Sequence, residues 1–106
     1  MSGNQNLNFK KPIDELEELL KFAGIPYERR EHFDGYQICV PRFKRNFMAS
    51  TICNRGSYGH EHGLLEFYDT GSNNEPIGFL SPSEAYELIA DYVDKNPRII
   101  GKGSRQ

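Results

Sequence analysis

Long hydrophobic runs are missing from this chain of 106 residues. No apolar stretch approaches the roughly 20 residues that a transmembrane helix needs, and the polar first six residues lack the apolar region of a secretory signal. We therefore expect a soluble, cytoplasmic protein with no membrane partner. The chain is also too short for two ordinary domains, which excludes mechanisms that need several domains.

Cysteine is scarce, and the two that occur, Cys39 and Cys53, do not make a disulfide framework. We expect free thiols. Cys39 lies between Ile38 and Val40, and Cys53 follows Ile52, contexts that are typical of small buried strand residues. A catalytic cysteine needs a nearby base and a polarising environment, so packing is the favoured interpretation of both.

Carboxylates are absent from one long window of the sequence. The formal net charge is -2 and the pI is about 5.9, yet residues 35–60 contain no Asp or Glu. The same window contains Arg42, Lys44, Arg45 and Arg55. A molecule with such separated charges suits recognition of a protein or a small anion better than recognition of duplex DNA.

The composition supports one packed domain, because 37% of the residues are hydrophobic and 12% are aromatic. The two ends differ from the rest: residues 1–10 are polar and Asn-rich, and residues 97–106 carry proline and glycine. We expect a single domain over residues 11–96, with flexible segments at residues 1–10 and 97–106.

Two amphipathic helices are predicted. The first has Pro12 at its first helical position and ends at Gly24. The second opens at Ser81, whose hydroxyl can accept from a first-turn amide while Glu84 bonds back to it, the pattern of a capping box. The apolar positions of their buried faces are Ile13, Leu16, Leu19, Leu20 and Ala23, then Ala85, Leu88, Ile89, Tyr92 and Val93.

Between the helices the hydrophobic period changes to two, which predicts strands joined by turns. The expected strands cover residues 27–32, 36–40, 47–53, 64–68 and 77–79. The first two are joined around Asp34-Gly35, a pair that tolerates the positive φ of a tight hairpin. We therefore predict an α+β domain: an antiparallel meander of four or five strands with an N-terminal and a C-terminal helix packed on one sheet face.

Alternation divides the strand residues between two sheet faces. The expected helix-facing residues are Tyr36, Ile38, Val40, Met48, Ile52, Leu65, Phe67, Ile77 and Phe79. The expected residues of the other face are Gln37, Cys39, Phe47, Ala49, Thr51, Cys53, Leu64, Glu66 and Tyr68. This second face is unusually apolar, and exposed apolar patches mark partner surfaces. A register shift of one residue, or loops folded over the sheet, would also account for it.

The most distinctive stretch is residues 54–63, which contain three glycines, two histidines and Arg55. Glycine lets the backbone approach a ligand, successive amides can bind an anion, and arginine can pair with phosphate or carboxylate. A long inter-strand loop that uses glycine for turns is the alternative. The spacing matches neither a Walker loop nor a dinucleotide fingerprint, and Ser57 lacks the strand-to-helix context of a nucleophile elbow.

His60 and His62 offer two imidazoles to a metal, and His32 is a conceivable third ligand. Two ligands do not make a site, and a catalytic zinc needs three protein ligands with an open position. Glu61 would have to be the general base, but in an extended segment it points away from both neighbouring histidines. Surface histidines, with no metal and no cofactor, are therefore the favoured interpretation.

Cations and aromatics are interleaved after Pro41, a composition that nucleic-acid grooves use for phosphate contact and base stacking. The residues concerned are Tyr36, Arg42, Phe43, Lys44, Arg45, Phe47, Arg55 and Tyr58. Four cations are few, and a pI near 5.9 lacks the basic footprint of a dedicated binder. A solvated loop is the simpler account.

Several short segments form a recognisable pattern: LLKFAGIP at residues 19–26, GYQI at 35–38, GSYG at 56–59, GLLE at 63–66 and GFLSPSE at 78–84. Over about residues 14–94 they resemble a group of small hypothetical proteins from phages and prophages of Gram-positive bacteria. The resemblance implies an intracellular protein encoded by a mobile element and assigns no activity. The His60-Glu61-His62 segment departs from the group's pattern, which weakens a metal role further.

Together these observations predict a non-enzymatic phage accessory protein that binds a protein partner, or a second copy of itself, through the open sheet face and the glycine-rich loop. An inhibitor of a host defence system is one version. A small-anion or nucleotide-binding protein, or a metal-dependent hydrolase, is the alternative, and weak binding of single-stranded nucleic acid ranks third. The expected contact residues are Arg55, Gly56, Ser57, Tyr58, Gly59, His60, His62, Arg42, Lys44, Arg45, Phe47 and Tyr68.

Overall fold

The structure, a computed structural model, describes residues 9–45 and 47–100, with side chains up to Arg98. Its elements are α1 (Lys10–Ala23), β1 (Glu28–His32), β2 (Gly35–Val40), β3 (Ala49–Cys53), the 3₁₀ turn η2 (His60–His62), β4 (Leu65–Asp69), β5 (Ile77–Leu80), α2 (Pro82–Lys95) and the 3₁₀ turn η3 (Pro97–Ile100). The predicted α+β class and the order of its elements are confirmed.

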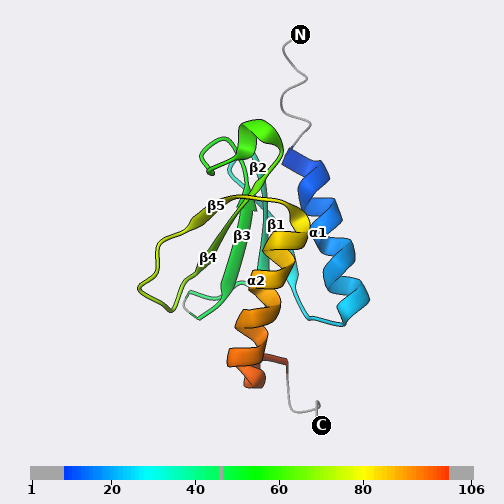
Figure 1. The fold of residues 1–106 in the computed structure, drawn as a ribbon, viewed down its shortest axis with the longest axis vertical. Coiled ribbons are helices and arrows are strands. Elements are labelled where there is room, and N and C mark those ends of the chain that lie inside the picture. Colours follow the sequence, from blue (N-terminus) through cyan, green and yellow to red (C-terminus); the bar gives the residue numbers. More distant parts are fainter. Residues whose placement is uncertain (1–8, 46, 101–106) are drawn as a thin grey trace.

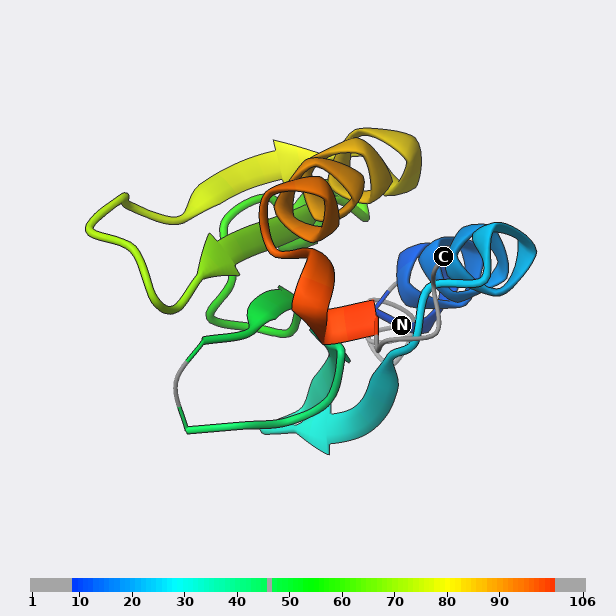
Figure 2. The same ribbon diagram turned by 90° about the horizontal axis from the view of Figure 1, so that it is seen from below.

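The five strands form one antiparallel sheet in the order β1-β2-β3-β4-β5, so every strand pairs with its neighbour in sequence. The two helices pack on the same side of this curved sheet (Figure 1), and Figure 2 shows both of them within its concave side. We call the opposite side, which neither helix covers, the open face.

The helix ends follow from their capping residues. Gly24 adopts a left-handed conformation with φ 73° and donates its N–H to the carbonyls of Leu20 and Lys21, which ends α1 where the sequence predicted. At α2 the Ser81 side chain accepts from the Glu84 N–H while the Glu84 carboxylate accepts from the Ser81 N–H, so the predicted capping box is confirmed.

Helix α1 begins two residues before the predicted Pro12, at Lys10. The aromatic side chain of Phe9 just before it is buried in the core, which favours ordering the chain from this residue onward. Residues 1–8 and 101–106, most of the two segments predicted to be flexible, lie outside the described part of the chain.

The helix-facing side of the sheet is only partly as predicted. Strand register places Ile38 opposite Thr51 and Thr51 opposite Phe67, so these three share the helix side. The residues predicted there that do belong to the core or pack against it are Tyr36, Ile38, Val40, Leu65 and Phe67. For β3 the prediction is wrong by one residue: Ala49, Thr51 and Cys53 face the helices, whereas Met48 and Ile52 belong to the opposite alternation.

The limited space beneath the helices explains which side of β3 faces inward. β3 is the central strand, and both helices contact it. Small side chains there allow the helices to approach, and larger apolar groups from the neighbouring strands and the helices fill the volume. Ala49 and Cys53 are fully buried in the same cluster as Leu16 of α1 and Ile89 of α2. Size, rather than apolar character alone, decides which side of β3 faces inward.

The prediction for β5 is right for Ile77 and wrong for Phe79. Ile77 pairs with Phe67 and so shares the helix side, although it is 44% exposed. Phe79 is exposed, and Leu80 occupies the core position instead. β4 and β5 pair with an irregularity between Leu65 and Phe67, and Phe79 has a positive φ of 59°. Such an irregularity shifts the alternation of side chains along the strand, which a strict period of two does not anticipate.

The β1-β2 turn differs by one residue from the prediction. His32 pairs with Gly35, so the two residues of the turn are Phe33 and Asp34. Gly35 belongs to β2, where an added Cβ would overlap the carbonyl oxygen of Cys53. This glycine therefore serves the close approach of two chain segments and not the turn itself.

Candidate functional site

The glycine-rich loop, residues 54–63, lies at the end of the sheet where β3 ends and β4 begins. Asn54 and Ser57 are buried and close the first part of the loop on itself. The Asn54 N–H donates to Ser57 Oγ at 3.0 Å, Ser57 Oγ donates back to the Asn54 carbonyl at 2.9 Å, and the Gly56 N–H donates to Asn54 Oδ1 at 2.8 Å. The Ser57 hydroxyl thus serves the loop's own structure and is not presented as a nucleophile.

Two glycines allow the loop to dock on β5. A Cβ added at Gly59, which has φ +96°, would lie 2.9 Å from the Phe79 Cα and N atoms. A Cβ added at Gly78 would overlap the Cβ of Tyr58, and the Phe79 N–H donates to the Tyr58 carbonyl at 3.2 Å. The space that these glycines leave is therefore filled by the protein's own backbone. This accounts for Gly59 without a ligand.

Arg55 is tied to the β1-β2 turn. Its Nε lies 3.1 Å from Asp34 Oδ2, and its backbone N–H donates to Asp34 Oδ1 at 3.0 Å. A phosphate or carboxylate ligand would have to compete with this carboxylate for the guanidinium. The arrangement accounts for Arg55 as an anchor of the loop, in addition to any contact with a ligand.

The three histidines have different neighbours. His60 Nδ1 lies 2.7 Å from the Ser57 carbonyl oxygen, and its ring contacts Phe9. The His62 ring lies beside Phe79, and the His32 ring beside Phe33. Burial, with a smaller contribution from Arg30, lowers the pKa of His32. Over residues 9–45 and 47–98, no three His, Cys, Asp or Glu side chains are grouped so that they could hold a metal ion.

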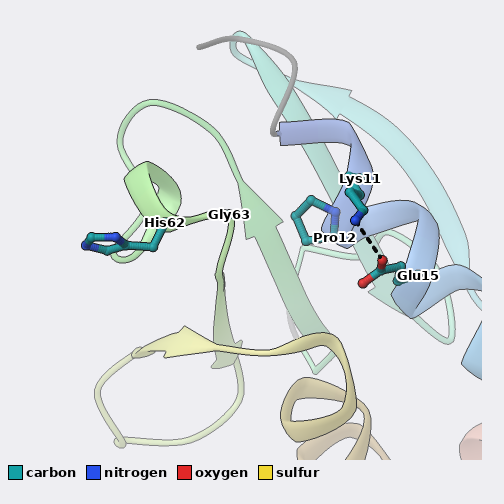
Figure 3. Close-up of a pocket in the computed structure, with 5 residues that line it drawn as sticks. All are labelled: Lys11, Pro12, Glu15, His62 and Gly63. Carbon is teal, nitrogen blue, oxygen red and sulfur yellow. Dashed lines mark ion pairs between the residues drawn. The ribbon is translucent and has the colours of Figure 1, made fainter. Parts of the chain in front are cut away.

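A shallow pocket of about 240 Å³ lies between the loop and the start of α1. Lys11, Pro12, Glu15, His62 and Gly63 line it, and Lys11 pairs with Glu15 at 3.6 Å. Figure 3 shows the His62 ring pointing away from Lys11 and Glu15. With the cation already paired and the imidazole turned outward, the pocket presents no convergent set of polar groups for a small molecule.

Aromatic rings are exposed where the docked loop meets β5. Tyr58 is 62% exposed and Phe79 is 57% exposed, and the exposed His62 ring lies 6.3 Å from that of Phe79. We call these three residues the aromatic patch. Phe79 was expected in the core, so its place here was missed from the sequence.

The cations after β2 lie at the other end of the sheet. The chain connects the end of β2 to the start of β3 here, and we call its described residues 41–45, 47 and 48 the basic loop. The five residues of β3 separate it from the glycine-rich loop by about 15 Å at the usual rise of a strand. Its residues Arg42, Lys44, Arg45 and Phe47 are therefore not joined to the expected contacts at residues 55–62. Tyr68, also expected as a contact, lies between the two on the open face, opposite Ser50.

The basic loop is held against the outer side of β1. The Phe43 N–H donates to Glu28 Oε1 at 2.8 Å, and the Arg30 guanidinium lies 3.9 Å from the centre of the Phe43 ring. Within the loop the Lys44 N–H donates to the buried sulfur of Met48. Arg30 was not among the predicted contacts, and Phe43 was named only in the mixture of cations and aromatics that is typical of nucleic-acid grooves.

The two cysteines are free, as predicted, and both are fully buried. Burial raises the pKa of each thiol to about 11. A nucleophilic cysteine requires the opposite shift, toward the thiolate near neutral pH. Their surroundings are those of small core residues.

Comparisons of the chain with protein-family models, with curated proteins and with solved structures found no match. Among the described helices, neither α1 nor α2 combines the length and apolar character needed to cross a bilayer.

Proposed function

We propose that this protein is a non-enzymatic binding protein that attaches to a protein partner, or to a second copy of itself, through the aromatic patch and the adjoining open face. The observation that supports this most strongly is the exposure of Tyr58 and Phe79 where the glycine-rich loop docks on β5. Exposed aromatic side chains carry much of the energy of protein interfaces because they bury a large area at a low cost in side-chain entropy.

The backbone of Phe79 favours the same interpretation. A bulky residue with φ near +59° is strained, and such strain costs about 1–3 kcal/mol. The strained conformation sends a large apolar ring outward while Leu80 enters the core. Folding alone would favour glycine or asparagine at this position, so a role for the ring in binding explains why phenylalanine is there.

Several features favour binding over catalysis at the glycine-rich loop. Ser57 is buried and hydrogen bonded within the loop, and Arg55 is paired with Asp34. Gly59 of the loop lies close to the backbone of β5, so the space beside it is not open to a small-molecule ligand. If the chain is encoded by a phage, as the resemblance implies, the partner would be a component of the host cell or of the phage itself, and a host defence component is one version of this proposal.

The test compares Phe79→Asn with the wild type. Asparagine tolerates a positive φ, so this variant removes the ring and keeps the backbone. The matched control is Phe22→Ser, because Phe22 is 95% exposed on α1, away from the aromatic patch. Light scattering after size-exclusion chromatography measures self-association, and affinity capture from host lysate with quantitative mass spectrometry measures other partners.

We expect either one captured protein or a dimer, present with the wild type and with Phe22→Ser. In Phe79→Asn the amount of captured protein, or the affinity of the dimer, should fall at least tenfold. A strict monomer whose captured proteins are the same for all three variants would contradict the proposal.

A further inference from the structure

Three cations of the basic loop have no acidic partner within the part of the chain that the structure describes. Lysines on the helices pair with nearby carboxylates: Lys10 with Asp14, Lys11 with Glu15, Lys21 with Glu18 and Lys95 with Asp91. Within residues 9–45 and 47–98, Arg42, Lys44 and Arg45 make no ion pair. Their charges are available to an anionic ligand.

The overall acidity of the protein does not cancel this local charge. Residues 35–60 contain no carboxylate, and Glu28 is the acidic side chain that hydrogen bonds to the described part of the loop. Many of the acidic residues lie on α1 and α2, which cover the other side of the sheet (Figure 2). Arg30 adds a fourth cation. Asp69 lies at the same end of the sheet, but its Cα is opposite that of Ala49, so it shares the helix-facing side. Exposed charges on that side are largely screened at a distance of a Debye length, about 8 Å at physiological salt.

Aromatic rings accompany the charges. Phe47 is 66% exposed with φ 61°, and Phe43 is 46% exposed with the Arg30 guanidinium on its ring. Rings and guanidinium planes together provide stacking surfaces for unpaired bases, while the cations provide contacts to phosphates. A duplex keeps its bases stacked inside, so it would make no stacking contact with these rings. An acidic protein would contact the cations and would not require the rings.

We propose that the basic loop is a binding site for single-stranded nucleic acid, in which Arg30, Arg42, Lys44 and Arg45 contact phosphates and Phe43 and Phe47 stack on bases. The site goes beyond the binding function proposed above. It lies at the opposite end of the sheet from the aromatic patch, so either proposal can fail without the other.

The experiment measures fluorescence anisotropy of labelled 20-nucleotide dT and U strands titrated with the full chain at 50 and 200 mM KCl. Three to four phosphate contacts to a single strand predict that affinity falls about 20- to 50-fold over this range. Binding of either strand supports the proposal. The strand that binds with the higher affinity shows whether the site prefers DNA or RNA. Absence of binding at 50 mM KCl would overturn it.

Matched variants locate the site. Neutralising the loop with Arg42→Gln, Lys44→Gln and Arg45→Gln is expected to weaken binding at least tenfold at 50 mM KCl and to remove most of the salt dependence. The control with the same charge change is Lys10→Gln, Lys11→Gln and Lys21→Gln on α1, which should change affinity less than twofold. Equal losses in the two triple variants would overturn the proposal.

A second pair of variants tests stacking. Phe47→Ala is expected to weaken binding about fivefold or more, and Phe22→Ala on α1 should have no effect. Two results would also overturn the proposal: a 20-base-pair duplex that binds as tightly as the single strand, or polyglutamate that displaces the labelled strand as well as an unlabelled strand does. In either case charge alone would explain the binding.

Discussion

Gly78 of β5 lies directly against Tyr58 of the glycine-rich loop: an added Cβ would overlap the Tyr58 Cβ and lie 3.1 Å from its carbonyl oxygen. That carbonyl accepts from the Phe79 N–H. The contact fixes the loop on the last strand of the sheet and, by doing so, turns the Tyr58 ring to the outside. A glycine outside the conspicuous loop is thus needed for the loop's position.

Gly78→Ala should lower the free energy of unfolding by about 1–3 kcal/mol, because the new methyl group has no space without a backbone shift. Urea denaturation followed by circular dichroism measures the change. Gly56→Ala is the matched control within the loop: its added Cβ would have Asn54 Oδ1 as its nearest neighbour, at an ordinary 3.6 Å, so a change within about 0.5 kcal/mol is expected. Equal effects at both sites would contradict the docking described here.

Arg29 joins β1 to α1, since its Nη1 donates to Asp14 Oδ1 and to Glu17 Oε1, each at 2.7 Å. The hydrogen bond from Arg29 is the main cause of the lowered pKa of Asp14, and the hydrogen bond from Tyr27, with that from Arg29, lowers the pKa of Glu17. A lowered pKa in the folded state gives stability that is present above the unfolded-state pKa and is lost as pH falls through the folded one.

We therefore expect the free energy of unfolding to decline as pH falls below the ordinary values of 4.5 for Glu17 and 3.8 for Asp14. Glu17→Gln should make this decline shallower. Urea midpoints between pH 7 and pH 2.5 measure it, and Glu87→Gln on the exposed side of α2 is the control. If Glu17→Gln and wild type lose stability in parallel over this range, the ion pairs are not the cause of the acid sensitivity.

Tyr27 should limit stability at alkaline pH. Burial, together with the hydrogen bond to Glu17, raises its pKa from 10 to about 12, so the folded state favours the neutral phenol. This contribution is present below pH 10 and is lost between pH 10 and about 12, as the unfolded chain ionises first. Tyr27→Phe should flatten that part of the stability profile, whereas Tyr58→Phe, at an exposed ring, should leave it unchanged. Denaturant midpoints from pH 9 to 12 distinguish the two.

Local sequence rules predicted the helices because the residues that start and end each helix are close together in the sequence. The capping box at Ser81 and Glu84 is contained in four residues, and Gly24 ends α1 by its own conformation. The side of β3 was predicted wrongly because it depends on how closely two distant helices approach the strand. Apolar character alone favoured Ile52 for the core, while the packing under the helices selected Ala49 and Cys53.

The candidate site shows the same limit. Residues 42–45 and 55–62 are near one another in sequence, which suggested one contact surface, but β3 carries the chain from one end of the sheet to the other between them. Phe79 was expected inside, because a strict alternation does not include the irregular pairing of β4 with β5. Only the fold reveals that the charges and the aromatic patch form two surfaces.

Cys39 and Cys53 should be unreactive in the native protein. Both are fully buried, and the raised pKa of each thiol, about 11, leaves little thiolate at pH 8. With a chromogenic disulfide reagent we expect no reaction in buffer and two thiols per chain in denaturant. Ser83→Cys, at an exposed position in the first turn of α2, is the positive control and should react at once. Rapid modification of either native thiol would contradict their assignment as core residues.

The β1-β2 turn carries strain that a substitution can release. Phe33, 88% exposed, has φ 58° at the first position of the two-residue turn, where glycine is the usual residue. Phe33→Gly should raise the free energy of unfolding by about 1 kcal/mol, because relief of the strain exceeds the entropy that glycine adds to the unfolded chain. Phe33→Ala removes the same ring but keeps the strain, so it should give no comparable gain in urea denaturation. If alanine stabilises as much as glycine, loss of the exposed ring and not relief of the backbone is the cause.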